Sequence, residues 1–284
     1  MMRNIREFQD FYGYSKPKLL VFQGSPRKLK SCANQTSKSK KLINYILEYW
    51  TQVYDIEVID LSIGDVTISP CKGCVSTSGG FHCHWKCTCY GKDLEKKDLM
   101  YEAEIYDKLE DCDAFLIVSP VNWYSVSTQV KAMFDRLVCA NLTLTREEAI
   151  DIMGEGNIKN SKITGAAELS GEYKDLLKNH LAGKTAAFYV HGDDGADDYS
   201  GEQLDIGDSN WEVVNSVMPL VYQCRYSGIN CPDELVEAFY INKGIPYYEA
   251  NLEMEYEGEF FQRMDSLLNK LSLELSSKKG KISY

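Results

Sequence analysis

The chain has no long apolar run and little positive charge. Its 284 residues include 31 lysines and arginines against 42 acidic residues, so the net charge is −11. A membrane-spanning helix needs roughly 18 to 20 consecutive apolar residues, and no stretch approaches that length. Non-specific binding to nucleic acid or to an anionic membrane depends on a basic surface, which this composition argues against. We therefore expect neither partner, although a local arginine and backbone amides can still bind a small anion.

A secretory signal is also missing from the N-terminus, because residues 1–10 contain no apolar core segment. We therefore expect a cytoplasmic protein. In that compartment the ten cysteines are expected to be reduced thiols or metal ligands, not disulfides.

Two common nucleotide motifs are absent. The sequence contains no G-x-x-x-x-G-K-[ST], and no G-x-G-x-x-G follows its first strand. This argues against a P-loop ATPase and a dehydrogenase with the dinucleotide fingerprint. An apolar share of 44% with 12% aromatics is ample for a hydrophobic core.

Short apolar runs alternate with segments of helical periodicity, which predicts a doubly wound α/β fold with a parallel sheet. The predicted strands are Lys18–Gln23, Tyr54–Leu61, Ala114–Ser119, Thr185–His191 and a short one near Arg225–Ile229. The predicted helices follow Ser37, cover Glu95–Asp111, begin near Val126, surround Trp211–Tyr222 and cover residues 250–275. We expect one domain over residues 1–284, with an N-terminal arm at 1–16 and a C-terminal helix and tail at 250–284. Two insertions are expected, a Cys-rich one after strand two (70–91) and one after the helix that follows strand three (141–180). The tail is expected to be frayed at Ser276–Lys281.

The segment that leaves the first strand is suited to a phosphate. Ser25 and Arg27 follow that strand and offer a hydroxyl and a guanidinium for charge-assisted hydrogen bonds. Ser37, Lys38 and Ser39 open the next helix, whose free amides and dipole favour an anion. The alternative is an ordinary turn with a serine helix cap.

A second segment, after the third strand, is suited to a flat ring. It consists of Pro120, Val121, Asn122, Trp123, Tyr124 and Ser125. Ligands of open α/β sheets bind beyond the carboxyl ends of the strands, which is where this segment lies. The alternative is that the Trp-Tyr pair caps the core.

Together, Gly24–Arg27, the turn at 119–127 and Lys131–Arg136 resemble the flavodoxin-like NAD(P)H-dependent FMN reductases over roughly residues 17–230. The resemblance implies a flavodoxin-like sheet of five parallel strands in the order 2-1-3-4-5, with FMN at the carboxyl ends. It places the phosphate at Ser25, Arg27, Ser37, Lys38 and Ser39, and the isoalloxazine at Pro120–Ser125. His191, Gly192 and Asp193 would close the far side of the ring. It also implies a homodimer. The chain departs from short members of the family in the longer loop before Ser37 and in the 141–180 insertion.

A cysteine-rich segment leaves the second strand, at what we expect to be the same rim of the sheet. Its cysteines are Cys71, Cys74, Cys83, Cys87 and Cys89, with His82 and His84 beside them. A C-x-x-C pair is the usual first half of a zinc or iron–sulfur site, but the C-x3-C-x-C that follows fits no zinc ribbon. A metal site at these five cysteines, free thiols packing a loop, and a redox-active pair all remain open. Cys32, Cys112, Cys139, Cys224 and Cys231 are interpreted as small core or loop residues.

The sequence thus predicts an FMN-binding oxidoreductase that takes electrons from NAD(P)H as co-substrate and passes them to a quinone, a flavin, a metal ion or a redox protein. FMN performs the chemistry, so no catalytic side chain is predicted. The alternative is an electron-transfer protein that relays single electrons between FMN and an iron–sulfur cluster at Cys71–Cys89. A sensor domain that has lost the flavin is a third hypothesis.

Overall fold

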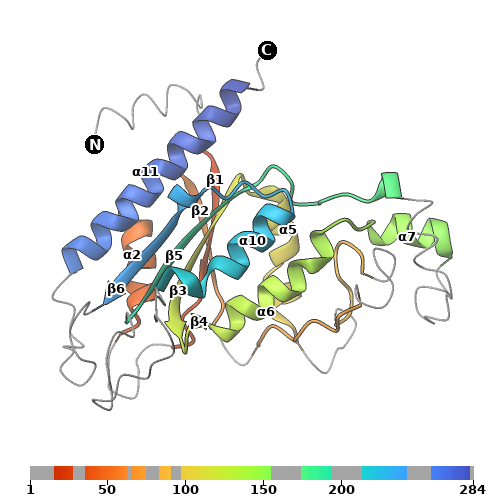
Figure 1. Cartoon of the computed structure of the whole chain (residues 1–284), viewed down its shortest axis with the longest axis horizontal. Coiled ribbons are helices and arrows are strands. Elements are labelled where there is room, and N and C mark those ends of the chain that lie inside the picture. The colour runs from red at the N-terminus through yellow and green to blue at the C-terminus, as the bar shows by residue number, and fades with distance from the viewer. Residues whose placement is uncertain are drawn as a thin grey trace, which may run out of the picture.

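Five parallel strands form the centre of the computed structural model, in the order β2-β1-β3-β5-β6 (Figure 1). They are β1 Lys18–Gln23, β2 Asp55–Asp60, β3 Ala114–Asn122, β5 Thr185–Asp193 and β6 Val236–Ile241, and the two-residue β4 Ser125–Val126 pairs antiparallel with β3. The structure describes residues 16–27, 36–62, 66–74, 83–90, 97–154, 174–193, 213–241 and 257–281. The expected flavodoxin-like order is confirmed, and its direction of winding reverses between β1 and β3, where such sheets bind ligands.

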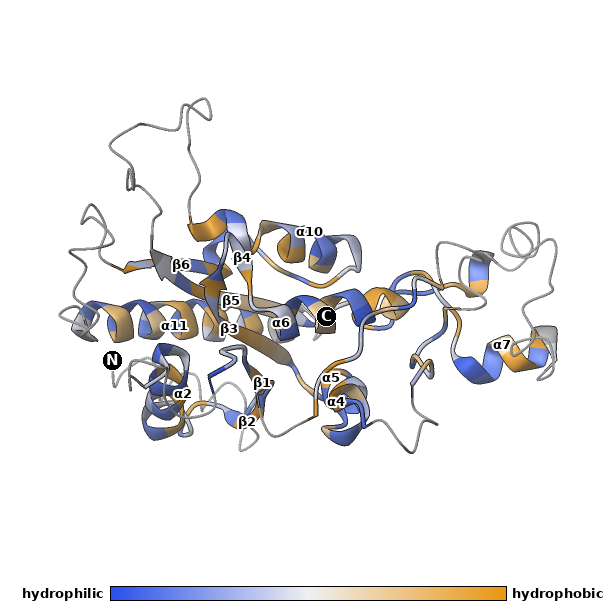
Figure 2. Cartoon of the chain, turned by 90° about the horizontal axis from the view of Figure 1, so that it is seen from below, coloured by the Kyte–Doolittle hydropathy of each residue, from blue (hydrophilic) through white to orange (hydrophobic). Residues whose placement is uncertain are grey.

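The helices cover both faces of the sheet because the central strands β1 and β3 are apolar on both sides. They are α2 Lys38–Tyr49, α4 Leu99–Glu102, α5 Ile105–Asp111, α6 Thr128–Arg136, α7 Arg146–Met153, α10 Met218–Tyr226 and α11 Glu257–Lys281. On β1, Leu19 and Val21 pack with α2 and α11, whereas Leu20 and Phe22 pack with α4, α5, α6 and α10. In Figure 2 the central strand β3 is coloured as hydrophobic, and α7 lies at the far end of the molecule from α2.

The helix expected at Glu95–Asp111 is instead two short helices, α4 and α5. Glu104 between them has a left-handed φ of 53°, which cannot continue a right-handed helix. The expected apolar face still holds, since Leu99, Tyr106 and Leu109 are buried.

The strand expected near Arg225–Ile229 is wrong. Helix α10 occupies that segment as far as Tyr226, because its buried Leu220, Val221 and Cys224 continue the helical stripe. Gly228, with a φ of 73°, follows the helix, and the fifth parallel strand is β6.

The expectation of a frayed tail at Ser276–Lys281 is also wrong, since α11 continues to Lys281. Leu271 and Leu275 are buried near its end, and Lys278 donates to the carbonyl of Gly183 at 3.0 Å and to Thr185 Oγ1 at 2.7 Å. These contacts tie the helix to the start of β5. No helix in the described ranges is both long and apolar enough to cross a membrane.

Candidate functional site

The loops that the sequence analysis assigned to a ligand follow three adjacent strands. Gln23 lies opposite Val118, and Pro120 lies opposite His191, so β1, β3 and β5 end side by side. The Gly24 amide donates to the carbonyl of Val118 at 2.8 Å. The structure therefore brings the first, second and third predicted segments to one edge of the sheet.

Two glycines allow these loops to approach one another. A Cβ on Gly24 would lie 2.5 Å from Val130 Cγ2, and a Cβ on Gly192 would lie 2.8 Å from Val121 Cβ. Both distances are too short for any larger residue. Gly24 thus allows the loop Gly24–Arg27 to pack closely against α6. Gly192 allows the segment at 191–193 to pack closely against β3.

At the phosphate end, three serines are buried and close to a helix N-terminus. Ser25 is 3%, Ser37 1% and Ser39 0% exposed. Ser37 is the N-cap of α2, where its side chain accepts from the Lys40 amide at 3.4 Å. The amides of Lys38 and Ser39 belong to the first turn of the helix, where they have no intrahelical partner and carry the positive end of the dipole.

Positive charge gathers at the same point. Burial, with the nearby charges of Arg27 and Lys41, lowers the pKa of Lys38. Burial, with Lys38 and Arg27, also lowers the pKa of His191 to about 3. Shifts in this direction are expected where cations lie together without enough anions. Hydroxyls, amides and cations in this arrangement are the donors that a phosphate group requires, so the residues fit the phosphate of FMN.

His191 is placed differently from the interpretation drawn from the sequence. Its buried imidazole Nε2 is 2.8 Å from Ser39 Oγ, and its ring contacts the ring of Phe260 edge-on. The side chain therefore lies beneath the N-terminus of α2. Asp193 ends β5, and Gly192 is the contact with Val121.

At the ring end, the chain makes a two-residue hairpin between β3 and β4. Asn122 pairs with Ser125, and the two residues between them, Trp123 and Tyr124, have left-handed φ angles of 51° and 64°. Such a turn favours Asn-Gly, and a bulky residue there costs roughly 1–2 kcal/mol. Trp123 is 92% exposed and Tyr124 56% exposed. The aromatic pair therefore does not cap the core, because the strained turn holds both rings at the surface beside the first loop.

The sequence did not predict a role for Gln23, whose side chain supports the phosphate end of the site through hydrogen bonds. Its side chain accepts from the Ser25 amide and donates to Asp60 Oδ1 at 2.8 Å, and Asp60 pairs with Lys40 at 3.2 Å. The sequence feature that could have indicated this role is a polar residue at the end of an otherwise apolar strand.

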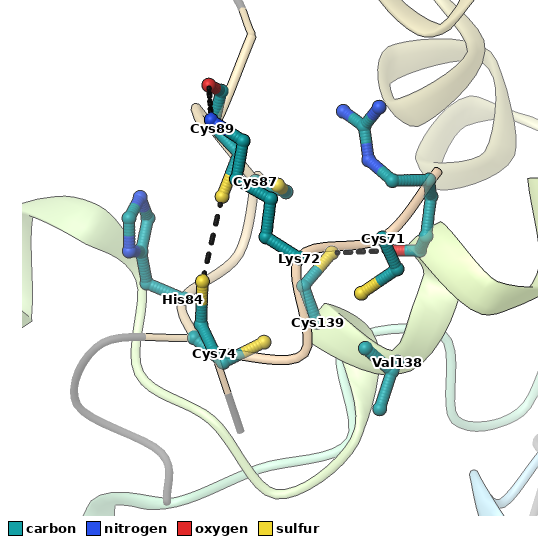
Figure 3. A pocket seen from close by; sticks show the side chains of 10 residues that line it. Cys71, Lys72, Cys74, His84, Cys87, Cys89, Val138 and Cys139 are labelled. Carbon is teal, nitrogen blue, oxygen red and sulfur yellow. Dashed lines mark hydrogen bonds between the residues drawn. The ribbon is translucent and has the colours of Figure 1, made fainter. Parts of the chain in front are cut away.

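A second candidate site is the pocket of the cysteine-rich segment (Figure 3). We call it the cysteine pocket, and its lining is Cys71, Lys72, Cys74, Cys83, His84, Cys87, Cys89, Arg136, Val138 and Cys139. The sulfurs of Cys74 and Cys89 are 3.6 Å apart, as the dashed line in Figure 3 marks. All five predicted cysteines therefore meet in one place, and His82 lies outside the described residues.

The pocket also contains groups that the sequence did not predict. Cys139, interpreted as a core residue, lines it from the turn after α6, and Arg136 comes from the last turn of that helix. The guanidinium pairs with Asp98 at 2.9 Å and donates to the Tyr101 hydroxyl at 3.1 Å. Burial of Arg136 could have been predicted from its position three residues after Met133, which places it on the buried side of the helix.

Neighbouring groups and burial tune the thiols. The hydrogen bond with Cys89, with a smaller contribution from Arg136, lowers the pKa of Cys87, and the same bond raises that of Cys89. Burial raises the pKa of Cys83 to about 12 and raises that of Cys139 well above its usual value.

The Cys-rich segment leaves β2 at the same rim as the proposed flavin loops, as expected, because Asp60 lies opposite Gln23, but its cysteines gather away from that rim. The hairpin joins α6 at its N-cap, Ser127, whose amide donates to Ser119 Oγ at 3.2 Å, whereas the cysteine pocket lies at the opposite end of the helix. Nine residues of helix span about 13 Å. In the part of the chain that the structure describes, no group of three or more His, Cys, Asp or Glu side chains is arranged so that it could hold a metal ion.

Comparisons with known proteins agree with the fold and identify a family. The family model described as NADPH-dependent FMN reductase matches residues 17–159, half of the chain. No curated protein matches the sequence. Among solved structures, RosB with bound 8-demethyl-8-formylriboflavin-5′-phosphate superposes with a TM-score of 0.51 at 12% identity, over 94% of this chain and 82% of that one. A putative quinone reductase from Klebsiella pneumoniae gives a TM-score of 0.48 at 18% identity, over 90% of this chain and 84% of that one.

Proposed function

The chain belongs to the NADPH-dependent FMN reductase family and is an FMN-binding, NAD(P)H-dependent oxidoreductase, and we propose that its three carboxyl-edge loops hold the FMN. The single observation that carries this assignment is the meeting of a phosphate donor set and an exposed aromatic hairpin at the ends of β1, β3 and β5.

In this proposal Ser25, Arg27, Ser37, Lys38 and Ser39 hold the phosphate. Arg27 and Lys38 supply charge, the serines supply hydroxyls, and the first turn of α2 supplies amides. His191 keeps the Ser39 hydroxyl in place through its 2.8 Å hydrogen bond.

Pro120–Ser125 and Gly192–Asp193 line the isoalloxazine. Backbone amides of the hairpin suit the polar edge of the ring, and the side chains of Trp123 and Tyr124 stand beside it at the surface. When bound, FMN supplies the redox chemistry between NAD(P)H and the acceptor. We assign no side chain as acid or base, because the protein's part is to bind and orient.

The electron acceptor is proposed to be a small quinone or flavin, with a redox protein as the alternative. Exposed aromatics at the hairpin tip suit a flat acceptor or a second copy of the chain in a homodimer, since large exposed apolar side chains mark interaction sites. A cytoplasmic location is supported by the nine described cysteines, none of which is in a disulfide.

A visible spectrum of the purified protein tests the proposal. We expect the absorption of a flavin, its release as FMN on denaturation, and its bleaching by NADH or NADPH in the absence of oxygen. Addition of a quinone should then restore the oxidised spectrum. A colourless protein that takes up no FMN would contradict the assignment.

The alternative function, a relay of single electrons through an iron–sulfur cluster at Cys71–Cys89, would need a larger cavity than the one that these cysteines line. The gathering of these cysteines in one pocket favours a metal-binding role. Iron and sulfide in the purified protein, with a flavin that is reduced in one-electron steps, would support the relay.

A further inference from the structure

The cysteine pocket differs from an ordinary cluster of packed thiols in the exposure of its sulfur-bearing residues. Cys71, Cys74, Cys87 and Cys89 are half-buried, whereas Cys83 and Cys139 are buried. The first four therefore form the accessible wall, and the other two form the floor.

The size of the cavity limits what it can hold. Its volume is about 10 Å³, which is close to the space that one water molecule or one small ion needs. An iron–sulfur cube adds eight atoms and would not fit without displacing the walls. A single ion fits.

One pair of sulfurs already has the spacing of a single-ion site. Four sulfurs at about 2.3 Å from a tetrahedral zinc lie roughly 3.8 Å from one another. Cys74 Sγ and Cys89 Sγ are already 3.6 Å apart. Cys71 and Cys74 form a C-x-x-C pair, and Cys87 and Cys89 form a C-x-C pair, so each half of the wall supplies two cysteines that are close in sequence.

The charge around the cavity suits an anionic complex. Lys72 and Arg136 line it, no carboxylate does, and the Lys72 Nζ lies 3.2 Å from the carbonyl of Cys89. Arg136 is 1% exposed, and its Nε has no hydrogen-bond partner among the described residues. A Zn²⁺ ion with four thiolates has a net charge of −2. Asp98 already balances the charge of Arg136 through their 2.9 Å ion pair, so Lys72 is the cation that would offset part of it.

From these observations we propose that Cys71, Cys74, Cys87 and Cys89 close around one Zn²⁺ ion, with Lys72 as the nearby counter-charge. All four cysteines bind as thiolates, so binding releases to solvent the protons of those that are still thiols. Zinc is preferred over iron because a four-sulfur site binds Zn²⁺ more tightly than Fe²⁺. The ion then fastens the Cys-rich segment to itself, next to the end of α6, and takes no part in electron transfer.

The test is metal and flavin analysis of the same full-length sample. We expect about one zinc per chain and no iron. After removal of zinc, addition of Co²⁺ alone should give the intense visible bands of a tetrahedral cobalt–thiolate site, and Zn²⁺ should abolish them. Three results would overturn the proposal. They are iron with sulfide in the purified protein, a disulfide between Cys74 and Cys89, and a protein that binds neither Zn²⁺ nor Co²⁺.

Variants identify the ligands. Cys74→Ser with Cys89→Ser should lower zinc retention on the order of tenfold or more, whereas Cys139→Ala and the distant control Cys231→Ser should retain it. Zinc retention equal to wild type in the Cys74→Ser, Cys89→Ser protein would refute this ligand set. If that variant is poorly folded, the cobalt spectrum of the wild-type protein still shows whether a thiolate metal site exists. FMN content is an independent readout, because flavin without zinc contradicts only this inference, and zinc without flavin contradicts only the proposed function.

Discussion

The two ends of α6 carry two kinds of cationic site in a protein whose net charge is −11. Next to the N-terminal end, where Gly24 approaches Val130, Arg27 and Lys38 stand beside hydroxyls and the first amides of α2. At the C-terminal end, Lys72 and Arg136 stand beside thiols. The first combination suits a phosphate and the second a metal thiolate. On this account the neighbouring donors, more than the cations, would determine which group binds.

The two ends also differ in how deeply the charge is buried, which predicts the largest effect. Arg136 and Asp98 form a pair whose side chains are 0% and 1% exposed. Arg136→Met leaves the carboxylate of Asp98 buried and unpaired, so we expect the free energy of unfolding to fall by roughly 3–5 kcal/mol. Urea denaturation measures it.

The control for that prediction is Lys131→Met, which breaks the exposed pair with Asp135 in the same helix. It should change stability by less than about 1 kcal/mol. The FMN affinity of folded Arg136→Met should equal that of wild type. Equal stability losses in the two variants would show that burial of the Arg136 pair is unimportant.

At the other end, Arg27→Ala should weaken FMN binding without loss of stability. A hydrogen bond to a charged group contributes about 1.5–3 kcal/mol, which corresponds to a rise in Kd of roughly 10-fold to 150-fold. Fluorescence titration of the flavin-free protein measures it. Riboflavin affinity and zinc content should not change, and an equal loss for riboflavin would place Arg27 away from the phosphate.

His191 gives the phosphate end a dependence on pH. Its pKa is about 3 in the folded protein against 6.5 for an unperturbed histidine, so the unfolded chain takes up a proton first as the pH falls. Its contribution to stability is complete above about pH 6.5 and is lost progressively down to about pH 3. At pH 5 the loss is on the order of 2 kcal/mol.

Comparison of wild type with His191→Gln by denaturation between pH 7.5 and pH 5 isolates this contribution. The glutamine keeps a partner for Ser39 and does not titrate, so the variant should lose less stability on acidification. Identical pH profiles would mean that the pKa of His191 is the same in the folded and the unfolded protein, which contradicts a lowered pKa.

The smallest effect is expected at the hairpin. Trp123→Asn with Tyr124→Gly relieves two left-handed φ angles and should stabilise the protein by roughly 1–2 kcal/mol, while FMN binding weakens. Thermal unfolding and flavin titration measure the two changes.

Leu142→Gly is the matched control for the hairpin variant. Leu142 also has a left-handed φ, 46°, but lies outside the flavin loops. It should stabilise the protein and leave FMN affinity unchanged. If both variants bind FMN like wild type, the strained hairpin has no part in the flavin site.

The sequence predicted the flavin edge better than the cysteine pocket because the two sites are built differently. Each flavin loop follows its own apolar strand, so a local pattern locates it, and the parallel sheet brings the strand ends together. Arg136 and Cys139 reach the pocket only through packing of α6 against the segment after β2, a long-range contact without a local pattern. The exposure of Trp123 likewise depends on a strained turn that residue types alone do not indicate.

The central claim is that the N-terminal end of α6 adjoins a site built for FMN through its phosphate. The most direct measurement is the ratio of riboflavin Kd to FMN Kd for the flavin-free wild-type protein. With an arginine, a lysine, buried hydroxyls and helix amides at the phosphate, the account predicts a ratio on the order of a hundred or more. A ratio near one would contradict it.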